Sequence, residues 1–422
     1  MQPHLHRLKN GLRLITTPNK GTEAITVLVL TGAGSRYETK EINGISHFLE
    51  HMFFKGAKKY KSAAEVSSAI DGVGGDFNAF TGKEYAGYYV KLAAHQKEIA
   101  FDVISDMLLY ASFKAEEIKK ERNVILEEYN MYQDTPMYQV GWDFERLLFG
   151  DQPLGWDEIG TKELIRTITH DDFVRYKKAL YTPDNTMISI AGVFDDKEIV
   201  ALTQRYFDFS QAAKQYEFLP YQPRKKDKRV VIQHKKTEQG HMILGAEGLP
   251  ARHPDVYALK VLGALLGGYM SSRMFLRVRE EKGLSYYIRT NAEDYTDTGV
   301  FSTSAGVDLK RVDEATEAIV HEYKLVTEEI VHAEELTRAK EFLKGKIILR
   351  LEDSEELAHL FGKQALLYPE IHDVPHILRS IDRVTAEDVH RVAKTLLLPE
   401  KLHLALIGPY ENESHFESLL HY

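Results

Sequence analysis

The beginning of the chain carries a pattern of apolar positions that predicts β-strands followed by a helix. Residues Leu5 to Thr16, which turn at Asn10-Gly11, and residues Ala24 to Thr31 alternate or run apolar, so we expect them to form a strand pair. The stretch from Asn43 to Phe54 is apolar on most sides of a helical wheel, which predicts a buried helix. Polar residues on such a helix need partners, because an unpaired buried polar group is costly.

A glycine-rich stretch from Gly72 to Thr81 is followed by a clearer β-strand pattern from Glu84 to Leu92. The simplest interpretation is a hairpin inside a sheet. The alternative is an edge strand whose free backbone groups pair with an extended peptide, since glycines permit a second chain to approach closely. The pattern alone leaves both interpretations open.

A second polar pattern lies on the helix that we expect from Lys114 to Tyr132. On a helical wheel Glu121 and Glu128 fall at the margin of the apolar face, whereas Glu127 points toward solvent. Carboxylates at a buried margin are costly unless they are paired or bind a cation. Glu128 is therefore a candidate metal ligand, and Glu121 a candidate carboxylate that orients a ligand or a water molecule. The alternative is an exposed helix with charges along its surface.

The second half of the chain repeats the first. A helix, a proline turn and a buried strand from Thr169 to Gly192 recur from Thr385 to Gly408, without a gap and 216 residues later. This interval is too long for a solenoid and indicates two tandem copies of one domain. We expect an α+β fold with two homologous α/β-sandwich domains, each a mostly antiparallel sheet with helices packed on it. They should occupy residues 1–210 and 229–422, joined by a polar, proline-bearing linker at 211–228.

Composition narrows the class of protein. At 422 residues the chain exceeds one usual hydrophobic core, and 43% hydrophobic with 28% charged residues is typical of a globular protein. No apolar run reaches the roughly 20 residues that span a bilayer, and no signal-peptide pattern opens the chain, so we expect a cytoplasmic protein without a membrane partner. A net charge of −9 argues against nucleic acid as a partner. Without cysteine, a metal must be held by His, Asp or Glu.

One stretch places two histidines and a carboxylate at metal-binding spacing, on one side of the predicted helix: His47, Glu50 and His51. They can be a hydrogen-bonded core cluster, a two-histidine-one-carboxylate iron site, or the inverted zincin pattern H-x-x-E-H, in which the histidines bind zinc and the glutamate is a general base. The third interpretation needs one further ligand, for which Glu128 is the candidate. The corresponding helix of the second copy, Asp255 to Leu266, has no such residues, so we expect one metal per chain.

These motifs together resemble the inverted-zincin peptidases, the family of pitrilysin, insulin-degrading enzyme and mitochondrial processing peptidase, in its half-length bacterial form. The resemblance covers nearly the whole chain and rests on His47-Phe-Leu-Glu50-His51 and Glu121-Arg-Asn-Val-Ile-Leu-Glu-Glu128, with Glu128 placed 77 residues after His51. It implies a zinc metalloendopeptidase with one Zn²⁺ per chain. His47, His51 and Glu128 would be the metal ligands, with catalytic roles for Glu50 and Glu121.

The resemblance also implies where a peptide substrate binds. Gly74 to Thr81 is similar to the substrate-pairing edge strand, and Arg279 and Tyr286 are similar to an Arg/Tyr pair that contacts substrate, with Tyr286 stabilising the oxyanion. From their own residue types, Arg279 and Tyr286 are better explained as a surface arginine and a packed tyrosine. The edge-strand residues expected to contact substrate are Gly75, Phe77, Asn78, Ala79 and Phe80.

Finally, the resemblance implies an assembly. Family members of this length are half of a clamshell, and two chains enclose a chamber. Because this chain carries both the metal motif and the Arg/Tyr pair, we expect a homodimer with shared sites, with a heterodimer as the alternative. A catalytically silent peptide-binding or scaffold subunit is the alternative function.

Overall fold

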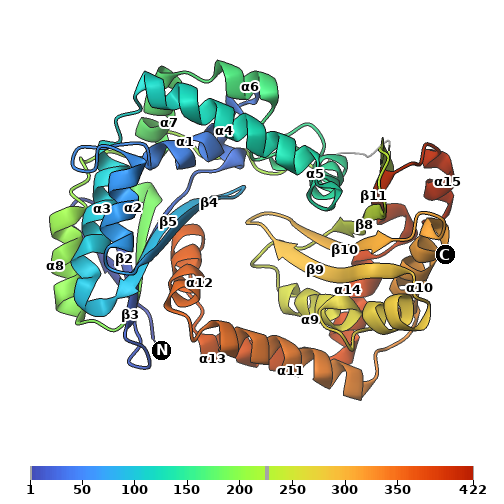
Figure 1. Cartoon of the computed structure of the whole chain (residues 1–422). Helices are drawn as coiled ribbons and strands as arrows, with labels where there is room; N and C mark the ends of the chain where they lie inside the picture. The colour runs from blue at the N-terminus through green and yellow to red at the C-terminus, as the bar shows by residue number, and fades with distance from the viewer. Residues whose placement is uncertain (1, 224–227, 422) are drawn as a thin grey trace. The chain divides into compact units, whose positions relative to one another are not determined.

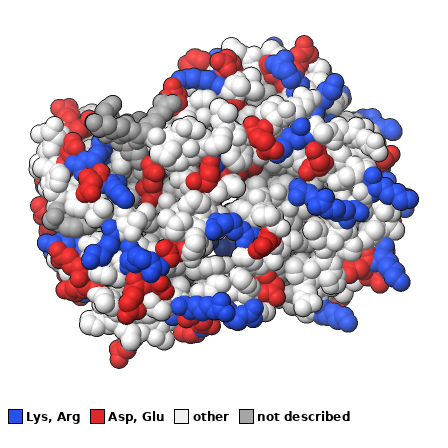
Figure 2. Space-filling view, turned by 180° about the vertical axis from the view of Figure 1, so that it is seen from behind, with Lys and Arg blue, Asp and Glu red and all other residues white. Residues whose placement is uncertain are grey.

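The structure, a computed structural model, describes residues 2–223 and 228–421, which form two compact units with one sheet each (Figure 1). Over the described residues, no helix is long and apolar enough to cross a membrane. On the face shown in Figure 2, basic and acidic side chains are interspersed with uncharged ones. Residues 224–227 of the predicted linker lie outside the described residues.

The first unit is built on a six-stranded sheet in the order β1-β2-β6-β3-β5-β4. The predicted turn at Asn10-Gly11 joins β1 to β2, but the predicted pairing with the Ala24–Thr31 segment is wrong. That segment, β3, pairs with β5 and β6, because the fully buried β6 lies between it and β2. The strands are β1 (His4–Arg7), β2 (Arg13–Pro18), β3 (Ala24–Thr31), β4 (Asp76–Thr81), β5 (Ala86–Ala93) and β6 (Thr186–Gly192).

Helices cover both faces of this sheet. Figure 1 shows α2, α3 and α8 on one side of it and α12 on the other. The helices of the unit, with α4 crossing its boundary, are α1 (Ile45–Phe53), α2 (Ala63–Asp71), α3 (Lys97–Tyr110), α4 (Ala115–Gln133), α6 (Lys162–Thr167), α7 (His170–Leu180), α8 (Asp196–Tyr206) and α12 (Ser354–Leu367).

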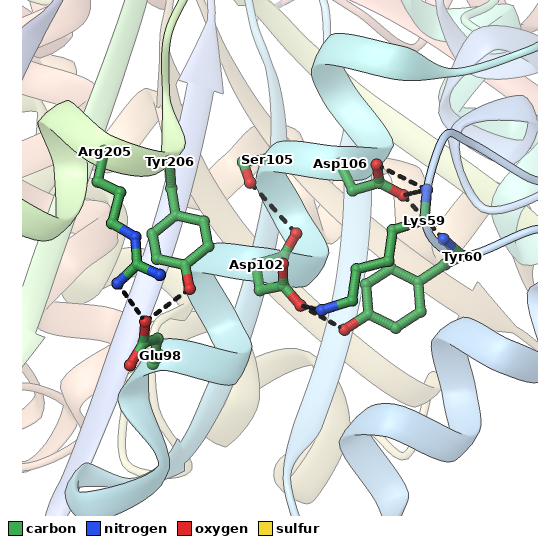
Figure 3. Close-up of polar contacts among 8 residues, drawn as sticks. All are labelled: Lys59, Tyr60, Glu98, Asp102, Ser105, Asp106, Arg205 and Tyr206. Carbon is green, nitrogen blue, oxygen red and sulfur yellow. Dashed lines mark hydrogen bonds and ion pairs between the residues drawn. The ribbon is translucent and has the colours of Figure 1, made fainter.

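A row of carboxylates on α3 holds neighbouring segments in place (Figure 3). Asp106 accepts hydrogen bonds from the backbone N–H groups of Lys59 and Tyr60, at 2.9 to 3.0 Å. One turn away, Asp102 accepts a hydrogen bond of 2.7 Å from the Tyr60 hydroxyl and forms an ion pair with Lys59. These contacts hold the loop that follows α1 against α3.

The second unit has a five-stranded sheet in the order β7-β11-β8-β10-β9. Leu404 and Leu406 of β11 belong to the core under α9, α10 and α14, whereas Ala405 and Ile407 belong to the core under α5. The elements are α5 (Pro136–Phe149), β7 (Val230–His234), β8 (Gly240–Glu247), α9 (Val256–Gly267), β9 (Ser285–Asp294), β10 (Gly299–Val307), α10 (Val312–Glu328), α11 (Ala333–Arg350), α13 (Val374–Arg383), α14 (Ala386–Leu396), β11 (His403–Gly408) and α15 (Glu413–Ser418).

The two sheets confirm the predicted α+β fold with two homologous domains. The order β2-β6-β3-β5-β4 in one matches β7-β11-β8-β10-β9 in the other, and β2–β6 and β7–β11 are the corresponding parallel pairs. The repeated helices α7 and α14 both begin with a capping box, made by Thr169 with Asp172 and by Thr385 with Asp388.

The boundaries of the compact units differ from the two consecutive ranges that the sequence predicted. Residues 130–156 belong with the second unit and residues 348–374 with the first. The physical reason is an exchange of equivalent helices: α5 of the first copy packs on β11 and β8, and α12 of the second copy packs on β6 and β3. Ser189 of β6, for example, donates a hydrogen bond of 2.7 Å to the carbonyl of Ala358.

Candidate metal centre

The position of α1 is fixed at its first residues. Gly44 precedes the helix with a φ of 97°, and a Cβ there would lie 2.5 Å from the carbonyl oxygen of Ile159, so only glycine fits. Glu38, which is 4% exposed, accepts hydrogen bonds of 2.8 Å from the backbone N–H groups of Gly44 and Ser46.

Two helices bring the three predicted ligands together. The Nε2 atoms of His47 and His51, on α1, lie 3.6 and 3.5 Å from the two carboxylate oxygens of Glu128, on α4. One ligand atom of each residue lies within 4.8 Å of the others. The neighbouring Glu127 is exposed, as predicted. The helical period therefore identified the right member of the Glu127/Glu128 pair for this cluster.

This donor set fits zinc. Zinc bonds to imidazole nitrogen and carboxylate oxygen are about 2.0 to 2.2 Å long, so neighbouring tetrahedral ligand atoms lie roughly 3.4 Å apart. The separations of 3.5 and 3.6 Å are close to this value. Three protein ligands leave a fourth position open, which is the arrangement of catalytic rather than structural zinc sites.

The electrostatics of His47 favour a bound cation. Burial alone would lower the pKa of His47, but the carboxylate of Glu128, with those of Glu50 and Glu158, outweighs burial and raises the pKa. In the metal-free protein His47 therefore holds a proton more readily than an ordinary histidine. A metal ion must displace that proton, so its binding weakens as the pH falls.

Glu121 lies behind His51, as predicted. Its Oε1 atom is 2.9 Å from Nδ1 of His51, and its Oε2 atom is 2.7 Å from Nζ of Lys55. Burial alone would raise the pKa of Glu121, but the hydrogen bonds from His51 and Lys55 outweigh burial and lower it. An ionised carboxylate only accepts, so Nδ1 of His51 carries the hydrogen and its Nε2 lone pair is available to a metal.

Glu50 lies on the same side of α1 as the two histidines and is held by the edge strand. The hydroxyl of Thr81, the last residue of β4, donates a hydrogen bond of 2.6 Å to Oε2 of Glu50. A carboxylate oriented beside an open metal position can accept a proton from water.

The predicted edge strand is present. β4 forms a hairpin with β5, as the simplest interpretation predicted, and is the last strand of its sheet. Gly75 precedes β4, Asn78 is exposed, and Phe77, Ala79 and Phe80 are half-buried. Pairing of a peptide with β4 stays a prediction.

Arg279 and Tyr286 lie in the second unit. The Arg279 guanidinium lies 4.7 Å from the ring centroid of Phe275, and its side chain is 40% exposed. Tyr286, on β9, is 59% exposed and not the packed tyrosine that residue type alone suggested. The structure brings together the three predicted ligands, Glu50 and Glu121, whereas the roles of all these residues, and of Arg279 and Tyr286, stay predictions.

Two neighbours of this cluster, Lys55 and Thr81, were not singled out from the sequence. Lys55 follows His51 by one helical turn, a spacing that could have indicated it. No sequence signal connects Thr81 to Glu50, because that contact depends on how β4 lies against α1.

Comparisons with known proteins point to one family. Residues 13–151 match the family described as Insulinase (Peptidase family M16), and residues 167–343 match the Peptidase M16 inactive domain. The chain is 36% identical over 404 residues to an uncharacterized zinc protease, YmxG, of Bacillus subtilis (strain 168), covering 96% of this chain and 98% of the relative. It is also 36% identical over 412 residues to an uncharacterized zinc protease of Streptomyces coelicolor, covering 96% and 89%.

Solved structures show the same fold. A protease from Helicobacter pylori, 23% identical, aligns with a TM-score of 0.88 over 97% of this chain and 99% of its own. A peptidase M16 inactive domain from Pseudomonas fluorescens, 16% identical, aligns with a TM-score of 0.90 over 97% and 98%. The family resemblance drawn from the sequence motifs is confirmed. With both of its copies matched and relatives similar along nearly its whole length, the chain belongs to peptidase family M16, the insulinase family.

Proposed function

We propose that this protein is a zinc-dependent endopeptidase that hydrolyses extended or unfolded peptides. The observation that carries the proposal is the convergence of His47, His51 and Glu128 on one point, with Glu50 beside them. A silent subunit is the competing function. The description "inactive domain" applies to residues 167–343, and all four of these residues lie outside that range.

The chemistry divides between the metal and the side chains. Zinc bound by His47, His51 and Glu128 would supply a Lewis acid that acidifies water and polarises the scissile carbonyl. Glu50 accepts the proton of the attacking water and delivers it to the leaving amine. Glu121 keeps the imidazole of His51 oriented.

We expect the substrate to pair with the open side of β4. Pairing with β4 depends on the backbone of an extended peptide rather than on its side chains, so the protein should show little preference for particular substrate sequences. The exposed Asn78 and the half-buried Ala79 lie in the middle of the strand. Most strands of a folded protein are already paired on both sides, which favours unfolded segments as substrates.

Metal removal tests the proposed function. Unstructured peptides incubated with the purified protein should be cut at internal bonds, as read by mass spectrometry. A chelator should stop the cleavage, and one equivalent of Zn²⁺ should restore it. Bound zinc without any cleavage would instead support the silent subunit.

The substitution Thr81→Val should lower kcat about tenfold or more and leave zinc content unchanged. Valine keeps the shape but removes the hydroxyl that donates to Glu50, and a hydrogen bond to a charged group contributes about 1.5 to 3 kcal/mol. Thr81→Ser keeps the donor and should retain most activity. Equal losses in both variants would show that the methyl packing, not the hydrogen bond, matters.

We also propose a homodimer that shares sites between protomers, because one chain carries both the metal cluster and the Arg279/Tyr286 pair. Mixing Glu50→Gln protein with Arg279→Ala protein should then recover part of the activity that each lacks alone. If the two variants are shown to exchange protomers and no activity returns, the proposal of shared sites is contradicted.

A further inference from the structure

Five side chains, alternately basic and acidic, form a row between α1 and α4. In spatial order they are His47, Glu128, His51, Glu121 and Lys55, and each neighbouring pair is joined by a contact of 2.7 to 3.6 Å. The spacing explains the row: His47, His51 and Lys55 follow one another at four-residue intervals, and Glu121 and Glu128 are two helical turns apart. Lys55, at the end of the row, has no assigned role.

We propose that Lys55 is a positioning residue for zinc, acting through Glu121 on the ligand His51. The proposal rests on the metal site of the proposed function. Lys55 fixes Glu121 by binding Oε2, which leaves Oε1 to hold Nδ1 of His51. The lysine therefore determines the direction in which Nε2 of His51 points.

The environment of Glu121 makes this dependence strong. Its side chain is 7% exposed, so water cannot readily replace a lost partner. Without Lys55, one buried carboxylate oxygen loses its charge-assisted hydrogen bond, and the carboxylate is no longer held at both oxygens. His51 then loses an acceptor of fixed position.

The other histidine has no such support. Nδ1 of His47 is buried and has no hydrogen-bond partner among the residues that the structure describes. The orientation of the two imidazole ligands is therefore controlled unequally, and His51 is the one tied to a fixed carboxylate. Loss of Lys55 therefore removes the residue that holds the carboxylate of Glu121 against His51.

Lys55 is itself anchored. Its backbone N–H donates a hydrogen bond of 3.2 Å to the carbonyl of Met52, directly after α1 ends, and its side chain is 24% exposed. The helix end thus fixes the start of the side chain, and Glu121 fixes its charged group. A simple stabilising ion pair is the competing explanation, and it predicts no effect on the metal.

The test measures zinc affinity and metal-free stability separately. Lys55→Met keeps an unbranched apolar stem but removes the charge, and should raise the zinc dissociation constant about tenfold, the lower range for residues behind a ligand. Lys55→Arg retains the charge and should recover most of the affinity. Competition with a zinc-binding dye on metal-free protein gives the constants, and thermal unfolding of the same samples gives stability.

Lys59 provides the matched control. It forms an ion pair with Asp102 of α3 (Figure 3) and takes part in none of the four contacts that make up the row. Lys59→Met should leave the zinc dissociation constant unchanged, whatever its effect on unfolding. Equal zinc affinities for Lys55→Met and wild type, or equal losses for Lys55→Met and Lys59→Met, would overturn the proposal.

A double variant tests the route. If Lys55 acts through Glu121, adding Lys55→Met to Glu121→Gln should weaken zinc binding no further, because the two residues are coupled. Additive losses would overturn the route through Glu121. Wild-type protein that binds zinc but cuts no peptide defeats the peptidase function alone, since every measurement in this series is of zinc affinity.

Discussion

Replacing Glu50 with glutamine is expected to reduce peptide cleavage by roughly 10²- to 10⁴-fold, the usual contribution of a general base, while zinc stays bound. Glutamine has nearly the same size, and its carbonyl oxygen can still accept the hydrogen bond from Thr81. It cannot accept a proton from water at neutral pH. The rate loss therefore measures the contribution of proton transfer, because the size and shape of the side chain hardly change.

Two measurements on Glu50→Gln protein are needed: kcat on an unstructured peptide and zinc content by mass spectrometry. Zinc content near one per chain is the internal control, since Glu50 is not among the three clustered candidate ligands. Cleavage within tenfold of wild type would exclude Glu50 as the base. Loss of zinc would make the rate uninformative about proton transfer.

Glu128→Gln is expected to empty the metal site. The neutral amide is a poorer ligand for Zn²⁺ than a carboxylate, and the charge that balances the cation between His47 and His51 disappears. The affinity loss should exceed the roughly 10- to 100-fold typical of residues behind a ligand. Zinc content after dialysis and the dissociation constant both report it.

The neighbouring residue is the control. Glu127→Gln removes the same charge from the same helix turn at an exposed position, and it should keep zinc and activity near wild type. Metal loss in Glu127→Gln equal to that in Glu128→Gln would mean that net charge near the site, not ligation, determines zinc binding.

The sequence could predict the members of the candidate metal cluster because the face of a helix on which a residue lies is a local property. Helical periodicity alone places His47, Glu50 and His51 on one side of α1, and favours Glu128 over Glu127 on α4. The duplication was also readable, since helix, turn and strand recur with their caps at Thr169 and Thr385.

The remaining features depend on contacts between distant segments. The position of β6 between β2 and β3 joins residues more than a hundred positions apart. The hydrogen bond from Thr81 to Glu50 forms only because β4 packs beside α1. Secondary-structure propensities do not predict that packing. The helix exchange was missed because the apolar face of a helix does not show which of two similar sheets it covers.

Because of this helix exchange, the first domain is not complete when the ribosome has finished the first copy. A ribosome that has delivered the first copy up to residue 210 has made every strand of its sheet, but not α12. The groups of β3 and β6 that later contact Ser354 and Ala358 are then uncovered. The nascent first copy is an unfinished domain until residues 354–367 emerge, so the first domain cannot be complete before most of the second copy has been made.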